Sequence, residues 1–198
     1  MIIEMNELFR LEIVQKSQDP KKIRFQDPHE VKFWATYFGL KYPSDLLVAF
    51  GYYMLQVLKL RVQHSVETQT IDGRRMSLLY KQLSKKYKKK NPRSTDKFWI
   101  DTEFLINSIR VWRDPARVSK VYFGIPKNIL HPESKVEAYK IYKYLEFGTK
   151  KHGKQIIPPR PLIYPHLRFI IANKGDYWIY FIKLLMDKKI TLKAFRRG

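Results

Sequence analysis

The sequence predicts one folded domain in which helices and strands are mixed. Two regions alternate apolar and polar residues as strands do: Leu8 to Lys16, and the two segments that flank Asp114-Pro115. A third region, Asp45 to about Thr68, repeats apolar residues at helical spacing. The chain has 198 residues, of which 44% are hydrophobic, so it can bury a core and is too apolar for a wholly disordered protein.

The chain is strongly basic. Lys and Arg total 39 against 18 Asp and Glu, so the formal net charge is +21 at pH 7. Solubility needs far less charge than this, so the excess predicts an acidic partner or neighbour. The sequence has no cysteine, which excludes disulfides and thiolate metal sites and fits assembly in the cytosol.

The N-terminus lacks the pattern of a signal peptide, because Glu4, Glu7 and Arg10 interrupt the apolar region that such a peptide requires. The longest nearly apolar stretch, Leu46 to Leu58, is shorter than the ~20 residues of a membrane span and contains Gln56. We therefore expect a buried helix there and no membrane partner.

The first elements are a strand and a short helix. The strand at Leu8 to Lys16 is followed by the turn signal "SQDPKK", so a hairpin could return through Lys22 to Phe25. Asp27-Pro28 then combines a cap with a proline and predicts a helix that runs to Phe38 and stops at Gly39.

The main helix is predicted from Asp45 to about Thr68, with Ser44 as its N-cap. One apolar stripe of this helix comprises Leu47, Gly51, Met54, Leu58 and Val62. The first turns are apolar nearly all round, so they should be covered on more than one side, by this chain or by another copy of it.

A basic surface segment follows from Tyr80 to Lys97, with Asp96 as its only acid. Its basic residues are Lys81, Lys85, Lys86, Lys88, Lys89, Lys90, Arg93 and Lys97. Repulsion among these charges is tolerable in a solvated segment and costly in a packed one, so the segment should lie outside the core.

A hairpin and a helix are predicted next in the second half of the chain. An antiparallel hairpin joins Ile109 to Arg113 with Val118 to Ile125. A helix from Pro132 to about Phe147 ends at Gly148, and its apolar positions are Val136, Tyr139, Ile141, Tyr142 and Leu145.

Two helices complete the chain. Pro165 suits the first turn of a helix to Asn173, which Lys174-Gly175 would close with a left-handed cap. Asp176 would cap a last helix, and residues from about 187 to 198 would form a short basic surface arm. The apolar residues of the last helix are Trp178, Phe181, Ile182, Leu184 and Leu185.

The sequence offers no recognisable catalytic, metal or cofactor site. Its histidines are His29, His64, His131, His152 and His166. None pairs with another at metal-ligand spacing, so we expect each to be solvated or hydrogen-bonded. Neither H-E-x-x-H, G-x-S-x-G, a P-loop nor G-x-G-x-x-G occurs.

The acidic residues and the aromatic residues each suggest another function. Asp96, Asp101 and Glu103 near the lysines could suit a metal-dependent nuclease, but Asp101-Thr102 also makes a helix N-cap with Glu103 in the first turn, which we prefer. Aromatic residues are 15% of the chain and could stack on single-stranded nucleic acid. Several of them sit instead at helical core spacing, namely Phe50, Tyr53, Trp178 and Phe181, whereas Tyr80 and Tyr87 leave both roles open.

Three ordered motifs carry a resemblance to a family. "YLEFGT", a polar loop and "PPRPLIYPHL" resemble the E-F-G-T … P-x-R-P-F-L-x-P-A-L ending of bacteriophage tail-completion, or head-tail joining, proteins. "TIDGRRMSLLYKQLSKKYKKK" and "WIDTEFLINSI" resemble patterns in the virion morphogenesis proteins of Mu-like phages. The motifs cover Ile71 to Gly175, and they depart from the family at Met76 and Glu103, where tryptophan and glycine are usual.

The resemblance implies an α+β domain, with an antiparallel sheet packed against a long central helix and the C-terminal helices. It implies a structural virion protein, assembled in the host cytoplasm into a ring, expected to be a hexamer, at the phage neck. The implied partners are the head connector or stopper protein and the tail terminator or tail tube protein, with no enzyme activity and no cofactor. This assignment also leaves room for non-specific contact with DNA in the channel. The runner-up is a basic nucleic-acid-binding module, and an enzyme with an unrecognised site comes third.

The family motif also predicts a docking loop from Glu146 to Pro161. Glu146 would anchor it by accepting backbone N–H bonds, and Gly148 would supply a positive φ. Prolines on both sides of Arg160 stiffen an extended segment, from which the guanidinium can reach a carboxylate. The expected interface residues are Glu146, Phe147, Gly148, Thr149, Ile156, Ile157, Pro159, Arg160 and Pro161. A rigid connection within one subunit is the alternative.

Overall fold

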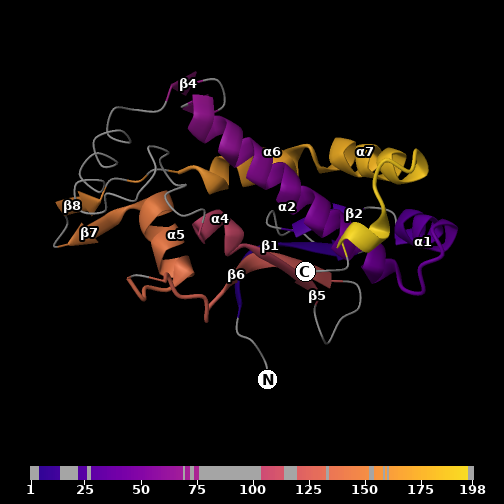
Figure 1. The fold of residues 1–198 in the computed structure, drawn as a ribbon, viewed down its shortest axis with the longest axis horizontal. Coiled ribbons are helices and arrows are strands. Elements are labelled where there is room, and N and C mark those ends of the chain that lie inside the picture. Colours follow the sequence, from indigo (N-terminus) through magenta and orange to yellow (C-terminus); the bar gives the residue numbers. More distant parts are fainter. Residues whose placement is uncertain are drawn as a thin grey trace. The chain divides into compact units, whose positions relative to one another are not determined.

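The computed structural model describes residues 5–13, 22–25, 28–68, 70–71, 74–75, 104–113, 120–132, 134–151, 154–157, 159 and 161–195. The strands are β1 (Met5–Ile13), β2 (Lys22–Phe25), β3 (Thr70–Ile71), β4 (Arg74–Arg75), β5 (Arg110–Arg113), β6 (Lys120–Pro126), β7 (Thr149–Lys151) and β8 (Lys154–Ile157). The helices are α1 (Pro28–Tyr37), α2 (Pro43–Thr68), α4 (Phe104–Asn107), α5 (Ala138–Phe147), α6 (Ile163–Ala172), α7 (Lys174–Met186) and the 3-10 helix η1 (Leu192–Phe195), as Figure 1 shows. The basic segment Tyr80 to Lys97, with Asp101 to Glu103, lies outside the described residues.

The chain is α+β and divides into two compact units, each built from segments that are distant in sequence. Unit 1 comprises Met1–Glu4, Leu58–Ser108 and Pro126–Phe169. Unit 2 comprises Met5–Val57, Ile109–Ile125 and Ile170–Gly198. The expectation of a single domain stays a prediction.

The sheet of unit 2 has the strand order β2-β1-β6-β5 among the described residues. β1 and β2 pair in parallel, with Arg10 opposite Lys22 and Ile13 opposite Phe25. The expected hairpin through β2 is therefore wrong, although both strands are present. Residues 14–21 lie between the two strands in the sequence, and at about 3.3 Å per residue they are long enough to reach from Ile13 back to Lys22 beside Arg10.

The predicted hairpin of β5 and β6 is confirmed. The two strands are antiparallel, with Arg110 opposite Gly124 and Arg113 opposite Val121. Ile109 and Val111 are buried, whereas Arg110 is exposed and Trp112 is half-buried, as expected of a strand with one face on the core. Arg113, on the same face as Val111, is exposed at the end of the strand.

Helix α2 begins at Pro43, earlier than predicted. Ser44 therefore lies inside the helix and is not its N-cap, and its buried Oγ has no hydrogen-bond partner among the described residues. Proline suits the first helical position because its φ is already helical and its missing N–H would have had no partner there. The predicted stripe from Leu47 through Met54 and Leu58 to Val62 is buried.

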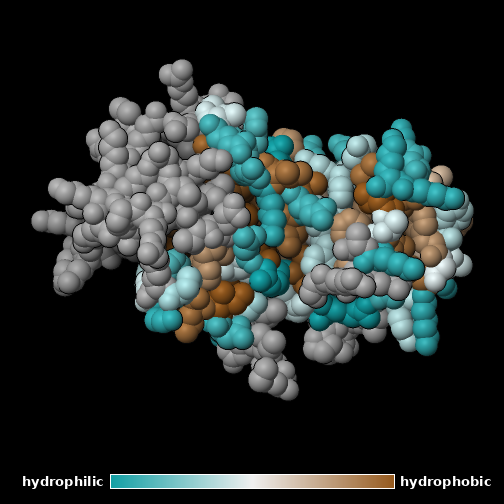
Figure 2. Space-filling model, in the orientation of Figure 1, coloured by the Kyte–Doolittle hydropathy of each residue, from teal (hydrophilic) through white to brown (hydrophobic). Residues whose placement is uncertain are grey.

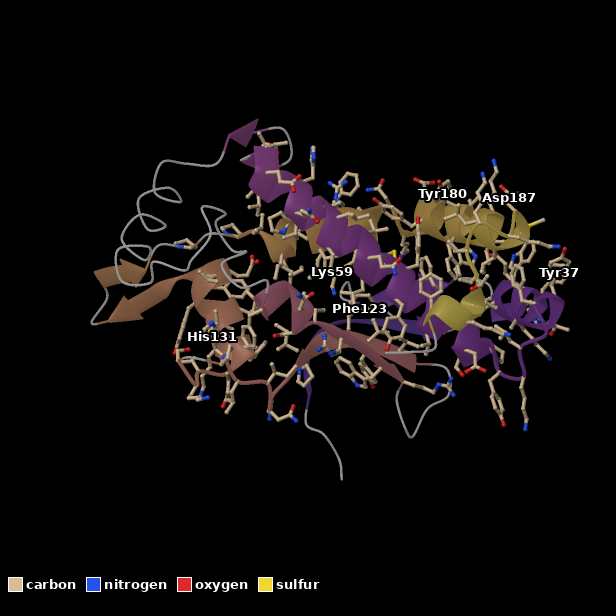
Figure 3. All side chains as sticks on the ribbon, in the orientation of Figure 1. Tyr37, Lys59, Phe123, His131, Tyr180 and Asp187 are labelled. Carbon is tan, nitrogen blue, oxygen red and sulfur yellow. The ribbon has the colours of Figure 1, made fainter. Side chains whose placement is uncertain are left out.

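The first half of α2 is covered on two sides within unit 2, as its apolar composition predicts. On one side Gly51 faces the sheet, where Val111 and Phe123 approach it; Figure 3 labels Phe123 on β6. On the other side the Phe50 ring lies 5.1 Å from the Trp178 ring and 5.4 Å from the Phe181 ring, centroid to centroid. β5, β6, α2 and α7 therefore contribute to the core of unit 2, together with Val31 and Ala35 of α1 and Phe195 of η1.

Polar contacts add to this core at its edges. The Tyr52 hydroxyl donates to the Val111 carbonyl at 3.3 Å, and the Arg113 guanidinium pairs with the Asp45 carboxylate. The Trp178 indole N–H donates to Glu30 Oε1 at 2.9 Å, which ties α7 to α1.

Three predicted details of the last helices are wrong. α6 and α7 are separated only by Asn173, whose φ of −101° and ψ of 22° turn the chain without a left-handed residue. Lys174 and Gly175 consequently belong to α7 and form no cap, and Asp176 lies in its first turn and not at its N-cap. Phe195, expected in a surface arm, is only 5% exposed and contacts the Phe181 ring.

Helix α5 begins at Ala138 and not at Pro132. Lys135 has a φ of 57°, which a helix cannot contain, and Leu130 forms an isolated bridge with Glu137. Gly148 ends the helix with a φ of 69°, as predicted. Gly39, with a φ of 67°, likewise follows α1.

Two helical glycines of unit 2 provide a matched test of the packing. A Cβ at Gly51 would lie 2.8 Å from Val111 Cγ1, whereas one at Gly175 would meet nothing within 4 Å. We expect Gly51→Ala to lower the free energy of unfolding by about 1 to 3 kcal/mol through overpacking. Gly175→Ala should raise it by up to about 1 kcal/mol through helix propensity. Urea unfolding measures both, and equal shifts would contradict the close approach of α2 to the sheet.

Candidate functional site

The candidate site centres on Glu146, near the C-terminal end of α5 in unit 1. Its side chain is 2% exposed. Oε1 accepts the backbone N–H groups of Leu162 at 3.1 Å, Ile163 at 2.6 Å and Tyr164 at 3.3 Å. The predicted role of Glu146 as an acceptor of backbone N–H bonds is therefore confirmed.

These three donors and Pro165 account for the N-terminus of α6. A helix leaves its first four N–H groups without partners in the helix. With α6 starting at Ile163, those positions are Leu162, Ile163, Tyr164 and Pro165. Glu146 accepts the first three, and proline has no N–H to satisfy. One carboxylate and one proline thus complete the helix start, and the negative charge lies where the helix dipole favours it.

Burial and hydrogen bonding act on Glu146 in opposite directions. Burial disfavours the carboxylate and raises the pKa of Glu146 from 4.5 to about 7, although the three backbone N–H bonds lower it. Oε2 is buried and has no hydrogen-bond partner among the described residues. Burial also raises the pKa of Tyr142, with a further contribution from the nearby Glu146 charge.

After Glu146 the chain forms a β-hairpin, whereas we expected a loop from Glu146 to Pro161. Gly148 combines a φ of 69° with a ψ of −176°, a conformation that is essentially restricted to glycine. β7 and β8 then pair antiparallel, with Thr149 opposite Ile157 and an irregularity between Thr149 and Lys150. Figure 1 shows this pair beside α5. Pairing lets backbone N–H and C=O groups of the two strands satisfy one another.

The other predicted interface residues divide into three groups. Phe147 is 59% exposed, and its ring centroid lies 6.4 Å from that of Tyr164, a residue absent from the predicted interface. Pro159 is exposed and Pro161 is half-buried. Arg160 and the side chains of Ile156 and Ile157 lie outside what the structure describes, so their predicted exposure stays a prediction.

A buried pair from distant segments supports the same helix. Ser65 on α2 and His166 on α6 are 5% and 2% exposed, with Ser65 Oγ 2.9 Å from His166 Nε2. His131 Nδ1 accepts the Ser134 N–H at 3.2 Å, and Figure 3 labels it beside α5. Both histidines are hydrogen-bonded, as predicted. Ser65 and His166 are 101 positions apart, so the sequence gave no indication that they pair.

The described residues contain no group of three or more His, Cys, Asp or Glu side chains that could hold a metal ion. Within the same ranges, no helix is long and apolar enough to cross a membrane. Comparison of the chain with protein-family models, with curated proteins and with solved structures finds no match. The geometry around Glu146 is therefore the observation on which a proposal can rest.

The raised pKa of Glu146 predicts a pH dependence. A folded-state pKa of about 7 above the unfolded value of 4.5 means that this carboxyl stabilises the fold most at acidic pH and loses that contribution as pH rises through 7. Relative to Glu146→Gln, the free energy of unfolding should fall by about 3 kcal/mol between pH 4.5 and pH 8. Urea titrations of both proteins across this range measure the difference. A difference that grows with pH would show instead that the N–H bonds outweigh burial and depress the pKa.

The backbone conformation of Gly148 predicts a second effect. Replacing it with alanine forces a Cβ into a region of φ and ψ that only glycine occupies readily, at a cost of about 1 to 3 kcal/mol. Gly148→Ala should therefore lower the thermal midpoint, whereas Gly175→Ala should not. An unchanged thermal midpoint for Gly148→Ala would contradict the backbone conformation of Gly148 just before β7.

Proposed function

We propose that this chain is a structural protein of a tailed-phage virion, which forms a ring at the neck and joins the tail to the head connector. The observation that carries the proposal is the set of three backbone hydrogen bonds that Glu146 accepts. It links the two parts of the motif by which the sequence resembles tail-completion proteins, "YLEFGT" and "PLIYPHL".

Three residues of this motif have a structural task. Glu146 accepts three N–H groups, Gly148 supplies the positive φ, and Pro165 removes a donor that would otherwise lack a partner. Tasks of this kind hold the chain in place. They support an architectural role for the motif.

The same arrangement suits a docking element. The hairpin β7–β8 begins just after the anchored Glu146, and the chain re-enters the fold at Leu162, whose N–H the same carboxylate accepts. A projection fixed at both ends loses little conformational entropy when it binds, so it suits an interface that forms once and persists. The neighbouring copies of the ring, the head connector or stopper and the tail terminator or tail tube are the proposed partners.

The charge of +21 favours a second candidate, a basic nucleic-acid-binding module. The two functions differ in a property that is simple to measure. A neck protein assembles with a defined stoichiometry, whereas a binding module acts as a monomer whose affinity for DNA falls steeply with salt.

Native mass spectrometry of the purified chain at about 0.15 M ionic strength tests the proposal, since exposed charges are largely screened there. We expect a closed oligomer, most simply six copies, and a ring in negative stain. Gly148→Val should yield soluble chain without rings, whereas Gly175→Ala should still form them. A monomer that binds duplex DNA with a steep salt dependence would overturn the neck assignment in favour of the module.

A further inference from the structure

The surface beside the Glu146 anchor carries two exposed aromatic rings. Phe147 is 59% exposed and Tyr164 is 46% exposed, and their ring centroids lie 6.4 Å apart. Both belong to unit 1 and come from different helices, Phe147 from the end of α5 and Tyr164 from the start of α6. On the face shown in Figure 2, apolar side chains also reach the surface around α5.

The buried carboxylate positions these two rings. Phe147 follows Glu146 directly in the chain, and Glu146 Oε1 accepts the Tyr164 N–H. The Phe147 ring also meets the buried Tyr142 ring edge to face, at 6.3 Å and 89°. Rings held on a fixed backbone lose little freedom on binding, which is what an anchor residue at an interface requires.

The chain around these rings is almost purely basic. Between Ala138 and Ala172 the only acidic residue is Glu146, which is buried. The basic residues in this range are Lys140, Lys143, Lys150, Lys151, Lys154, Arg160 and Arg168. Of these, Lys140 pairs with Glu137 at 3.3 Å, and Lys143 lies over the Tyr139 ring at 5.7 Å. The partner that fits such a surface carries acidic groups around an apolar recess.

Two other occupants fit less well. A second copy that met this surface with its own copy of the same surface would place two basic segments opposite each other, so like charges would meet. Single-stranded nucleic acid stacks its bases on the open faces of successive rings. Here the Phe147 and Tyr164 rings are inclined at 59°, and the Phe147 and Tyr142 rings at 89°, so they present a wedge and not a stacking platform.

We propose that Phe147 and Tyr164 form the anchor of a docking surface for an acidic protein, with the two rings entering an apolar recess that acidic side chains surround. This inference rests on the proposed docking role of the β7–β8 region. It adds the residues that make the contact and the chemistry of the partner, and Glu146 serves as their positioning residue.

A selection from a random library of 15-residue peptides, displayed on their own mRNA, tests the proposal without a known partner. The bait is the full chain, compared with the double variant Phe147→Ser and Tyr164→Ser. The matched control is the double variant Phe33→Ser and Tyr37→Ser, which removes two rings that are 61% and 62% exposed on α1 in unit 2. A third variant exchanges the rings, Phe147→Tyr with Tyr164→Phe.

We expect the wild type to enrich peptides that combine several Asp or Glu with aromatic or aliphatic residues. The most enriched peptide, measured by fluorescence anisotropy, should bind at least tenfold more weakly to the Phe147 and Tyr164 serine variant. It should bind unchanged to the α1 control and to the ring-exchange variant. Replacing its acids with amides should weaken it at least tenfold. Circular dichroism establishes that each variant is folded, and Tyr164→Ser alone replaces the double variant if the latter is not.

Several results would overturn the inference. One is equal enrichment of peptides on the wild type and on the Phe147 and Tyr164 serine variant. Another is enrichment of peptides that contain no Asp or Glu, and a third is that no peptide is enriched. Binding of a 20-residue oligothymidylate that depends on both rings would assign the surface to nucleic acid. Loss of the oligomer in the serine variant would assign it to a second copy. If the ring forms and the selection fails, this inference alone fails, whereas a monomer that still selects acidic peptides through the two rings contradicts only the neck assignment.

Discussion

The arrangement of unit 1 around α5 and α6 depends on one buried carboxylate. A helix start inside a protein must satisfy N–H groups that have no partner in the helix, and burying them unsatisfied would cost free energy for each. Glu146 meets this constraint for α6 with a single oxygen, and Pro165 removes the remaining donor. The consequence is that the end of α5, the start of the hairpin and the start of α6 are fixed together.

This solution has its own cost, which the second oxygen shows. Oε2 is buried without a hydrogen-bond partner among the described residues, and burial raises the pKa of Glu146 to about 7. A neutral Gln or an apolar side chain would avoid that cost, but it would also weaken the bonds to the helix start. In some proteins a buried charged group is retained because it fixes the position of the chain. We infer the same role for Glu146, which fixes the backbone that carries the exposed rings of Phe147 and Tyr164.

Unit 2 depends on a different constraint, the close approach of a helix to a sheet. Gly51 lets Val111 come nearer to the axis of α2 than any side chain would allow. The opposite side of the same helix packs against α7 through Phe50, Trp178 and Phe181. Most apolar residues of the first half of α2 are consequently buried within this chain.

The sequence by itself determined the faces of the elements and the local role of several residues. The period of the apolar residues identified α2 and its buried stripe, the alternation identified β5 and β6, and the motif identified Glu146 as an acceptor and Gly148 as a position of positive φ. Only the tertiary structure decided where helices begin, that β2 runs parallel to β1, and that the donors to Glu146 belong to α6. Periodicity fixes which side of an element is buried, but the direction of a strand and the start of a helix depend on partners that the fold brings from far along the chain.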